Sequence, residues 1–596
     1  MKNKLFSTIV ILSILIIVSC NDDFLNRYPE TSITEANYFK SANDLELYSN
    51  QFYNYFMYFG SSFFASLPTD RPSDNVCTSS TDEELYMLMS GGIVPSNASQ
   101  WDWSKIRTVN YMIARAGNAT GDNISHYIGL ARMVRACLYY YEEVLRYSDV
   151  PWYSHDLQTT DKELLYKTQD SRALVVDSIM ADFDYAVKTM KSGSDRTLLS
   201  KETAQAYLAR TALFEASWRK YHSELGLNDA DKYYKKAISA CEELMNSQEF
   251  SLTTDYVANF RNNDLKGNKE MIMYQDYNYG DPNLTWWNGL WGSYGMLSRD
   301  LMESYLYVKD NKAIPYTSVE GYQTKSFDEF YKNRDPRLIA TFWTPGFTRY
   351  GQPNAAIPDL KDGGYAIKKY EAFSTNQLGW GASAKCYSDL PIFRYAEILL
   401  IYAEAKAELG IMTQADVDKT INLLRDRVGM PRASLSEWLN NIDPVLDKKY
   451  PNVQSSQKGA VLEIRRERRV ELASEGFRYK DLMRWACGQY FDKVQEGIYF
   501  PGFGKYDLNG DGDPDILIVA TNADKEKYAT DIARYSIISY VLEDGNVSLS
   551  NGTSGYIKPA GKDGVFKFES PKDYYYPVSA QDMTINPNLV QNRYWK

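Results

Sequence analysis

The chain has 596 residues, of which 24% are charged and 44% hydrophobic, and this balance excludes a disordered or fibrous protein. The formal net charge of -11 argues against nucleic-acid binding, because contacts to phosphates need clustered Lys and Arg side chains. Most of the 49 Tyr and 12 Trp must pack in a core, but we expect some of them to form an exposed binding surface.

The N-terminus resembles a bacterial lipoprotein signal. A short positive segment precedes an apolar run over residues 5–18, which is shorter than the ~17–25 residues that a membrane-spanning helix needs. The run leads into the sequence IVSC, which predicts a signal peptide over residues 1–19 and a lipid on Cys20 that anchors the protein to a membrane. The acidic stretch over 21–26 is similar to the surface-export signal of Bacteroidota lipoproteins, which implies a body outside the cell.

Four helices are predicted in the first half of the chain, where apolar residues recur at helical spacing. They cover residues 127–147, 171–190, a stretch that begins at Ser200, and 231–245. The inner stripe expected for the second helix is Leu174, Ile179, Phe183 and Val187. These helices come in adjacent pairs, and small residues allow close approach, as in tetratricopeptide arrays. The sequence therefore predicts a mostly all-α fold, a tetratricopeptide-like scaffold of helical pairs without a strict repeat period.

The second half of the chain begins with a different composition. Residues from about 250 to 385 are rich in Gly, Pro, Asn, Tyr and Trp, so we expect a long loop-rich excursion that carries the ligand site. Helices are predicted to resume over 392–409, 414–427 and 459–485. One body over residues 20–596 is expected, consisting of a helical-repeat part over about 30–250, the excursion over about 250–385, and C-terminal helices with an irregular region after Gly488 over about 386–596.

Charged residues fill the predicted helix over 459–485. Glu463 can pair with Arg466, and Arg468 with Glu471, because residues three apart lie on the same helical face. A structural role is favoured over a catalytic one, since a helix of this kind is clamped between its neighbours by ion pairs.

Four separated segments carry a family resemblance. They are residues 22–29, 135–151, 424–431 together with 464–485, and 576–578 together with 586–592. The third is the most specific, with LRDRVGMP followed by IRRERRVEL. In this order the segments resemble the SusD/RagB family of outer-membrane nutrient-binding lipoproteins.

The resemblance implies a non-catalytic cell-surface protein that captures an oligo- or polysaccharide and passes it to a SusC-like, TonB-dependent outer-membrane transporter. Together with the anchor expected on Cys20 and the net charge that argues against a nucleic-acid partner, this interpretation requires no cofactor. A sugar ring has an apolar face of C–H groups and a rim of hydroxyls, so its site needs flat aromatic rings beside amide, carboxylate or guanidinium groups.

Two aromatic clusters fit this requirement. The resemblance places platform tryptophans near the sequence WDW, so Trp101 or Trp103 is expected to bind the glycan. The second cluster lies in a Gly- and Asn-rich stretch that is poor core material, and consists of Trp286, Trp287, Trp291 and Tyr294. Core packing is the alternative for both clusters. The resemblance also implies polar sugar contacts from Asp70, Arg71, Asp74 and Asn75.

The sequence DLNGDGDPD over residues 507–515 matches the front of a calcium loop. It predicts a structural Ca²⁺ held by Asp507, Asn509, Asp511 and Asp513. Ile518 stands where such a loop has its bidentate Glu, so a solvated acidic turn is the alternative.

Enzyme signatures are few. The three His lie far apart without metal-ligand spacing, and the sequence contains neither a GxSxG elbow nor a P-loop. The Cys other than Cys20 have no CxxC spacing, so buried thiols are expected for most of them, and one disulfide of unassigned pairing is the alternative. Two alternatives stay open: capture of a peptide or protein, and an all-helical glycoside hydrolase with two carboxylates ~5–10 Å apart in a deep cleft.

Overall fold

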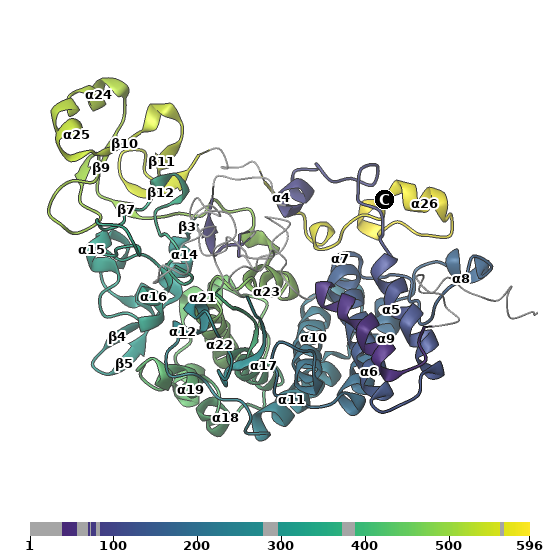
Figure 1. The fold of residues 1–596 in the computed structure, drawn as a ribbon. Helices are drawn as coiled ribbons and strands as arrows, with labels where there is room; N and C mark the ends of the chain where they lie inside the picture. The colour runs from purple at the N-terminus through teal and green to yellow at the C-terminus, as the bar shows by residue number, and fades with distance from the viewer. Residues whose placement is uncertain are drawn as a thin grey trace, which may run out of the picture.

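The computed structural model describes residues 38–55, 70–71, 73–78, 84–277, 296–371, 388–560 and 566–596. Helices dominate and the strands are short (Figure 1), so the predicted mostly helical fold is confirmed. In these ranges, no helix is long and apolar enough to cross a membrane.

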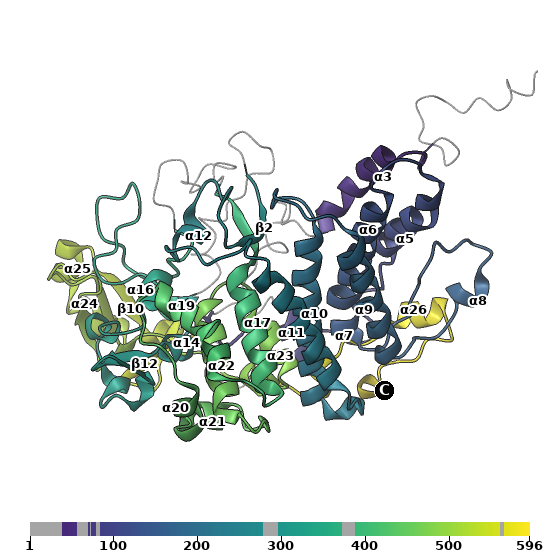
Figure 2. The same ribbon diagram turned by 90° about the horizontal axis from the view of Figure 1, so that it is seen from below.

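The first half of the chain forms a group of helices at one end of the molecule (Figures 1 and 2). Their bounds are α3 (Ala42–Ser49), α4 (Glu84–Met89), α5 (Ser104–Arg115), α6 (Ile124–Leu138), α7 (Leu145–Tyr147), α8 (Lys162–Leu165), α9 (Arg172–Thr189), α10 (Lys201–Tyr221) and α11 (Ala230–Asn246). The π-helix Tyr139–Val144 joins α6 to α7, so the helix predicted over 127–147 is continuous but changes its winding. Ser171 and Ser200 cap α9 and α10 by accepting hydrogen bonds from backbone amides, which fixes where both helices begin.

The predicted inner stripe of α9 is wrong at one position. Ile179 and Phe183 are fully buried, but Leu174 is 48% exposed. The buried face begins instead at Val175 and Val176. Ile179 lies five positions after Leu174, which is a rotation of about 140° beyond a full turn on a helix with 3.6 residues per turn.

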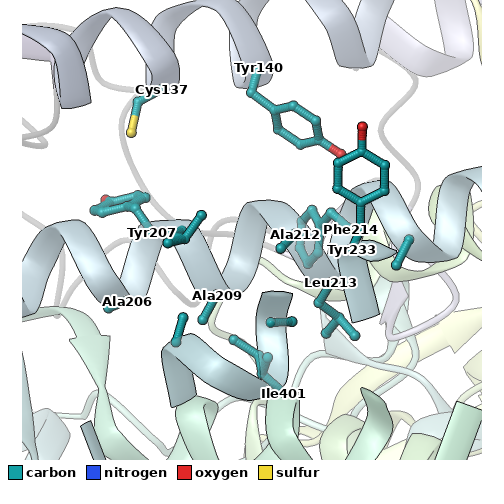
Figure 3. Close-up of a cluster of buried hydrophobic side chains, with 14 of the residues drawn as sticks. Cys137, Tyr140, Ala206, Tyr207, Ala209, Ala212, Leu213, Phe214, Tyr233 and Ile401 are labelled. Atoms are coloured by element: carbon teal, nitrogen blue, oxygen red, sulfur yellow. The ribbon is translucent and has the colours of Figure 1, made fainter. Parts of the chain in front are cut away.

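The helix α10 lies where this group meets the C-terminal helices, and most of its residues are buried (Figures 1 and 2). Figure 3 shows Ala206, Ala209 and Ala212 along it, with Tyr140 on the helix above and Ile401 on the helix below. All five side chains are buried. The small residues let neighbouring helices approach closely, as the sequence predicts.

Tyrosines supply much of the core, in agreement with the composition. The largest fully buried side chains include Tyr139, Tyr140, Tyr233 and Tyr234. The predicted buried thiols are also found, at Cys137, Cys241 and Cys487.

The middle of the chain consists of loops and short elements, as predicted, wherever the structure describes it. They are α12 (Ala258–Arg261), β2 (Met271–Gln275), β3 (Met296–Leu297), α14 (Arg299–Ser304), β4 (Tyr307–Lys309), β5 (Lys312–Ile314), α15 (Phe327–Phe330) and α16 (Pro336–Thr341). The strand β3 pairs with β1 (Val76–Cys77). This segment builds a second core cluster around Tyr305, Phe330 and Phe342.

The C-terminal helices differ from the predicted ranges at their ends. The elements are β6 (Leu390–Arg394), α17 (Tyr395–Glu408), α18 (Gln414–Asp418), α19 (Ile421–Arg427), α20 (Leu435–Asn440), α21 (Pro444–Lys449), α22 (Lys458–Glu471) and α23 (Arg478–Arg484). The first residues of the helix predicted over 392–409 form β6, which pairs with β2. The helix predicted over 459–485 is two helices, because Ser474 and Gly476 have φ of 64° and 79° and cannot continue a right-handed helix.

The region after Gly488 is more regular than predicted. It contains β7 (Tyr499–Phe500), β8 (Gly504–Tyr506), β9 (Ile516–Val519), α24 (Asn522–Glu526), α25 (Ala529–Tyr535), β10 (Ile538–Val541), β11 (Val547–Leu549), β12 (Gly555–Pro559) and α26 (Ala580–Ile585). Two three-stranded sheets form, in the orders β10-β9-β8 and β11-β12-β7. The chain then returns to the N-terminal helices, where α26 lies beside α5, α7 and α8 (Figures 1 and 2).

Candidate functional site

A pocket of about 280 Å³ opens where three distant parts of the chain meet. Its walls come from the start of α5, from the loop between α7 and α8, and from α26 with the residues that follow it. Trp101 and Trp103 both line it, so the structure places the first predicted aromatic cluster at a cavity.

The two tryptophan rings are half-buried and held by edge-to-face contacts. Their centroids lie 5.6 Å apart. The ring of Trp101 meets Tyr147 at 5.3 Å and 84°, and the ring of Trp103 meets Tyr153 at 5.2 Å and 87°. Such contacts fix the orientation of aromatic rings. We therefore describe this cavity as the tryptophan pocket, with two rigid rings in its wall.

Hydrogen bonds fix the backbone on which these rings are mounted. The backbone amide of Trp101 donates to Asp582 Oδ2 at 3.0 Å, which joins the start of α5 to α26. Asp102 Oδ1 accepts from the amide of Ser104 at 2.9 Å, and bonds from Ser104 lower the pKa of Asp102. The buried Trp101 Nε1 finds no acceptor in the part of the chain that the structure describes.

A buried ion pair positions the polar wall of the pocket. Arg135 Nε donates to Asp182 Oδ2 at 2.7 Å, and its Nη1 donates to Asn110 Oδ1 at 2.7 Å. Asn110 Nδ2 in turn donates to the carbonyl of Tyr153 at 2.9 Å. Sequence analysis did not identify Arg135 or Asn110 as site residues. The sequence did offer one signal for Arg135: it is a charged residue among the apolar residues of the helix predicted over 127–147.

The remaining wall mixes apolar and polar groups, with Ile106, Leu165 and Ile585 beside His155 and Asn586. Asp582 is the single acidic side chain among the described residues that line the pocket. A glycosidase needs two carboxylates about the scissile bond. The arrangement offers ring stacking and hydrogen bonding, which are the means of binding a sugar.

The polar residues predicted to contact sugar are buried elsewhere. Asp70, Arg71, Asp74 and Asn75 are each at most 6% exposed, and none of them lines the tryptophan pocket. Burial alone would raise the pKa of Asp74, but Arg469, Arg478 and Lys449 hold it well below its usual range. This placement, against α21–α23, favours a structural role over the predicted sugar contact.

Other predicted residues lie outside the described residues. These are the lipidation site Cys20 and the second aromatic cluster, Trp286, Trp287, Trp291 and Tyr294. The predictions for them stay predictions.

In the predicted calcium loop, the acidic side chains bond to the loop itself. Asp507 accepts from the amides of Gly510 at 2.6 Å and Gly512 at 2.8 Å, and Asp511 accepts from the amide of Asp513 at 2.9 Å. Over the described residues, no group of three or more His, Cys, Asp or Glu side chains converges as a metal site. The calcium prediction for Asp507, Asn509, Asp511 and Asp513 therefore remains to be tested.

Comparison with known proteins identifies the family. The profile of the SusD family matches residues 242–595, which is more than half of the chain. The chain belongs to the SusD family. A SusD-like protein of Formosa agariphila is 23% identical over 506 residues, which cover 81% of this chain and 91% of that protein. The predicted family is thus confirmed.

Solved structures of SusD-like proteins share the fold. A SusD-like carbohydrate-binding protein from Bacteroides fragilis superposes with a TM-score of 0.65 at 20% identity, covering 93% of this chain and 99% of that one. A laminarin-binding SusD-like protein gives a TM-score of 0.53 at 16% identity, covering 93% of this chain and 99% of that one. At these identities the likeness establishes the fold.

Proposed function

We propose that this SusD-family protein is a non-catalytic binding protein that captures an oligo- or polysaccharide in the tryptophan pocket. The observation that carries the proposal is the pair of half-buried rings, Trp101 and Trp103, fixed at 5.6 Å beside polar groups in one cavity. Rigid rings bind the C–H face of a sugar at a low cost in side-chain entropy, while the exposed imidazole of His155 in the same wall can bond to its hydroxyls.

Relatives support the ligand class. One solved relative is described as a carbohydrate-binding protein and another as laminarin-binding. Capture of a peptide is the alternative binding function, and a hydrolase is disfavoured by the single carboxylate in the described lining of the pocket.

The proposed setting is the cell surface. The IVSC sequence supports an acyl anchor on Cys20 in the outer membrane, and the family supports delivery of the glycan to a SusC-like, TonB-dependent transporter. The protein would act by holding the glycan near the transporter, and this role needs no cofactor.

The test is glycan binding by single tryptophan variants. Trp101→Ala and Trp103→Ala should each weaken the affinity ~5–30-fold, because an aromatic anchor typically contributes 1–2 kcal/mol or more. Trp343→Ala is the matched control, since Trp343 is also half-buried but lies outside the pocket. Affinity electrophoresis or calorimetry measures binding, and the melting temperature measures folding.

Two results would change the proposal. If Trp101→Ala and Trp103→Ala bind normally while alanine variants in the second aromatic cluster lose affinity, the site moves to Trp286, Trp287, Trp291 and Tyr294. If a broad glycan panel does not bind but peptides do, capture of peptides replaces capture of glycans.

A further inference from the structure

A second pocket, of about 460 Å³, lies on the other side of the C-terminal segment. Its walls come from the turn after α7, from the start of α9 and from the last residues of the chain. None of its lining residues is among the residues predicted to bind from the sequence. We refer to it as the C-terminal pocket.

The two pockets share a wall. Leu589 lines the tryptophan pocket, and its neighbour Val590 lines the C-terminal pocket. Gln169 holds this wall in place: its Nε2 donates to the carbonyl of Val590 at 2.7 Å, and its Oε1 accepts from the amide of Val590 at 3.0 Å. Tyr147 lines the C-terminal pocket while its ring packs against Trp101. A ligand chain held in one pocket is therefore close to the other.

Ser148 has an unusual conformation in the wall of the C-terminal pocket. Its φ of 67° and ψ of -71° define a γ-turn of the rare, strained form, closed by a 3.0 Å hydrogen bond from Asp149 N to Tyr147 O. The residue is 6% exposed, and its hydroxyl has no hydrogen-bond partner among the described residues. A glycine would adopt this turn without the clash of a Cβ atom. A strained backbone conformation at a buried polar residue that lines a cavity is typical of functional sites.

The charged side chains in the wall are of both signs, with Asp149 beside Arg172, Arg593 and Lys596. Arg172 forms a buried ion pair with Glu215 at 2.7 Å, and the guanidinium of Arg593 donates to the carbonyl of Glu224. Asp149 would repel an anionic ligand, so the wall is not a cluster of cations of the kind that binds anions. Tyr594, in contrast, is half-buried and stacks on Tyr575 at 5.8 Å and 18°, which leaves an aromatic surface for an apolar face.

We propose that the C-terminal pocket is a second saccharide site, for a neutral sugar unit that packs on Tyr594 and bonds to the hydroxyl of Ser148. The ligand class rests on the proposed function, but the site itself is distinct from the tryptophan pocket. A glycan long enough to cross the shared wall occupies both pockets.

The experiment compares four variants on one panel of neutral gluco-, manno-, galacto- and xylo-oligosaccharides, with uronate oligosaccharides as the acidic members. Ser148→Gly removes the hydroxyl and the strain together, and Ser148→Ala removes the hydroxyl alone. Each should weaken binding of a neutral oligosaccharide about 2- to 10-fold, the usual effect of one lost hydrogen bond, and Ser148→Gly should melt no lower than the unaltered protein.

The matched control is Ser474→Gly. Ser474 also has positive φ, at 64°, is 1% exposed and has a hydroxyl without a partner among the described residues, but it lines neither pocket. It should therefore bind every oligosaccharide as the unaltered protein does. The fourth variant, Trp101→Ala, reports on the tryptophan pocket separately.

The outcomes are distinguishable. If both Ser148 variants bind like Ser474→Gly while Trp101→Ala loses affinity, the second site is refuted and the proposed function stands. If the Ser148 variants change the binding of uronates alone, the neutral class is refuted. If the unaltered protein binds no member of the panel, both proposals fail.

Discussion

Glu143 is a buried carboxyl group in the π-helix Tyr139–Val144, at 6% exposure and without a described partner for its Oε2. Burial, with help from the charge of Glu142, raises its pKa to about 8, although Arg146 and Lys105 act in the opposite direction. The group is therefore protonated in the folded protein at neutral pH and ionised in the unfolded chain.

We predict that Glu143 makes stability fall as the pH rises from about 4.5 to about 8. In this window the unfolded chain releases the proton and the folded protein retains it. The free energy of unfolding therefore falls by up to about 1.4 kcal/mol per pH unit as the pH rises. Glu143→Gln removes this slope, and urea unfolding at several pH values measures it. Glu163→Gln, on the exposed surface of α8, is the control and should keep the slope. Parallel pH profiles for Glu143→Gln and the unaltered protein would contradict the prediction.

At the scale of the element, α22 acts as a charged clamp. Its Glu471 meets Arg427 at 2.6 Å, Arg337 at 3.1 Å and Arg394 at 3.2 Å, and all four side chains are at most 2% exposed. Burial by itself would raise the pKa of Glu471, but these three guanidinium groups hold it far below its usual range. The helix thus joins α16, β6 and α19 through one carboxylate.

Glu471→Gln should lower the free energy of unfolding by at least ~1.5–3 kcal/mol, the contribution of a hydrogen bond to a charged group, because it removes one carboxylate that three buried guanidinium groups share. Each arginine keeps a second carboxylate, with Arg427 retaining only the longer contact to Glu270 at 3.3 Å. Denaturant unfolding followed by circular dichroism measures the change. Asp328→Asn is the control: Asp328 pairs with Lys332 at 3.7 Å with both side chains more than half exposed, so a change within ~0–1 kcal/mol is expected. Equal effects of the two substitutions would show that the clamp does not stabilise the fold.

The acidic loop over 507–515 is the predicted calcium site, and thermal unfolding tests it. If it binds Ca²⁺, millimolar calcium should raise the melting temperature relative to excess EDTA by mass action, and Asp511→Ala should abolish the difference. The loop carboxylates that now accept amide hydrogen bonds would then be shared with the ion. Identical melting curves in calcium and EDTA would identify a solvated turn.

At the scale of the whole molecule, both pockets lie where the end of the chain returns to the N-terminal helices. Asp582 bonds to the amide of Trp101 across 481 positions, and Asn586 Nδ2 donates to the carbonyl of Lys167 at 2.8 Å across 419. Closing these contacts requires the intervening chain to be folded. The proposed ligand sites are therefore products of the complete fold.

Attachment to the membrane is the last prediction. Cys20→Ala should give a protein without lipid that is released from the membrane fraction, because the thiol that accepts the lipid is missing. Metabolic labelling with a fatty-acid probe measures it, with Cys137→Ala as the control at a buried thiol. Undiminished labelling of Cys20→Ala would exclude Cys20 as the acceptor.

Local patterns in the sequence determined the family, the helical class and the beginnings of several helices. Ser171 and Ser200 cap α9 and α10 at the predicted positions, because a cap depends on residues within one turn. The expected ion pair of Glu463 with Arg466 is also found, at 3.0 Å, because residues three apart lie on the same face of a helix. The expected pair of Arg468 with Glu471 is wrong: Arg468 pairs with Asp481 at 2.8 Å and Glu471 with Arg427 at 2.6 Å, since partners from other elements compete.

The tertiary structure alone decided which polar residues are buried and which aromatic residues line a cavity. The sequence predicts that Asp74 contacts sugar. In the structure its buried carboxylate accepts a hydrogen bond from Arg478, which lies 404 positions further along the chain. Trp101 and Trp103 pack against the main core cluster with part of their surface, and they also line a pocket because α26 arrives from the far end of the chain. Contacts between residues so far apart depend on the topology of the whole fold, which periodicity and spacing do not encode.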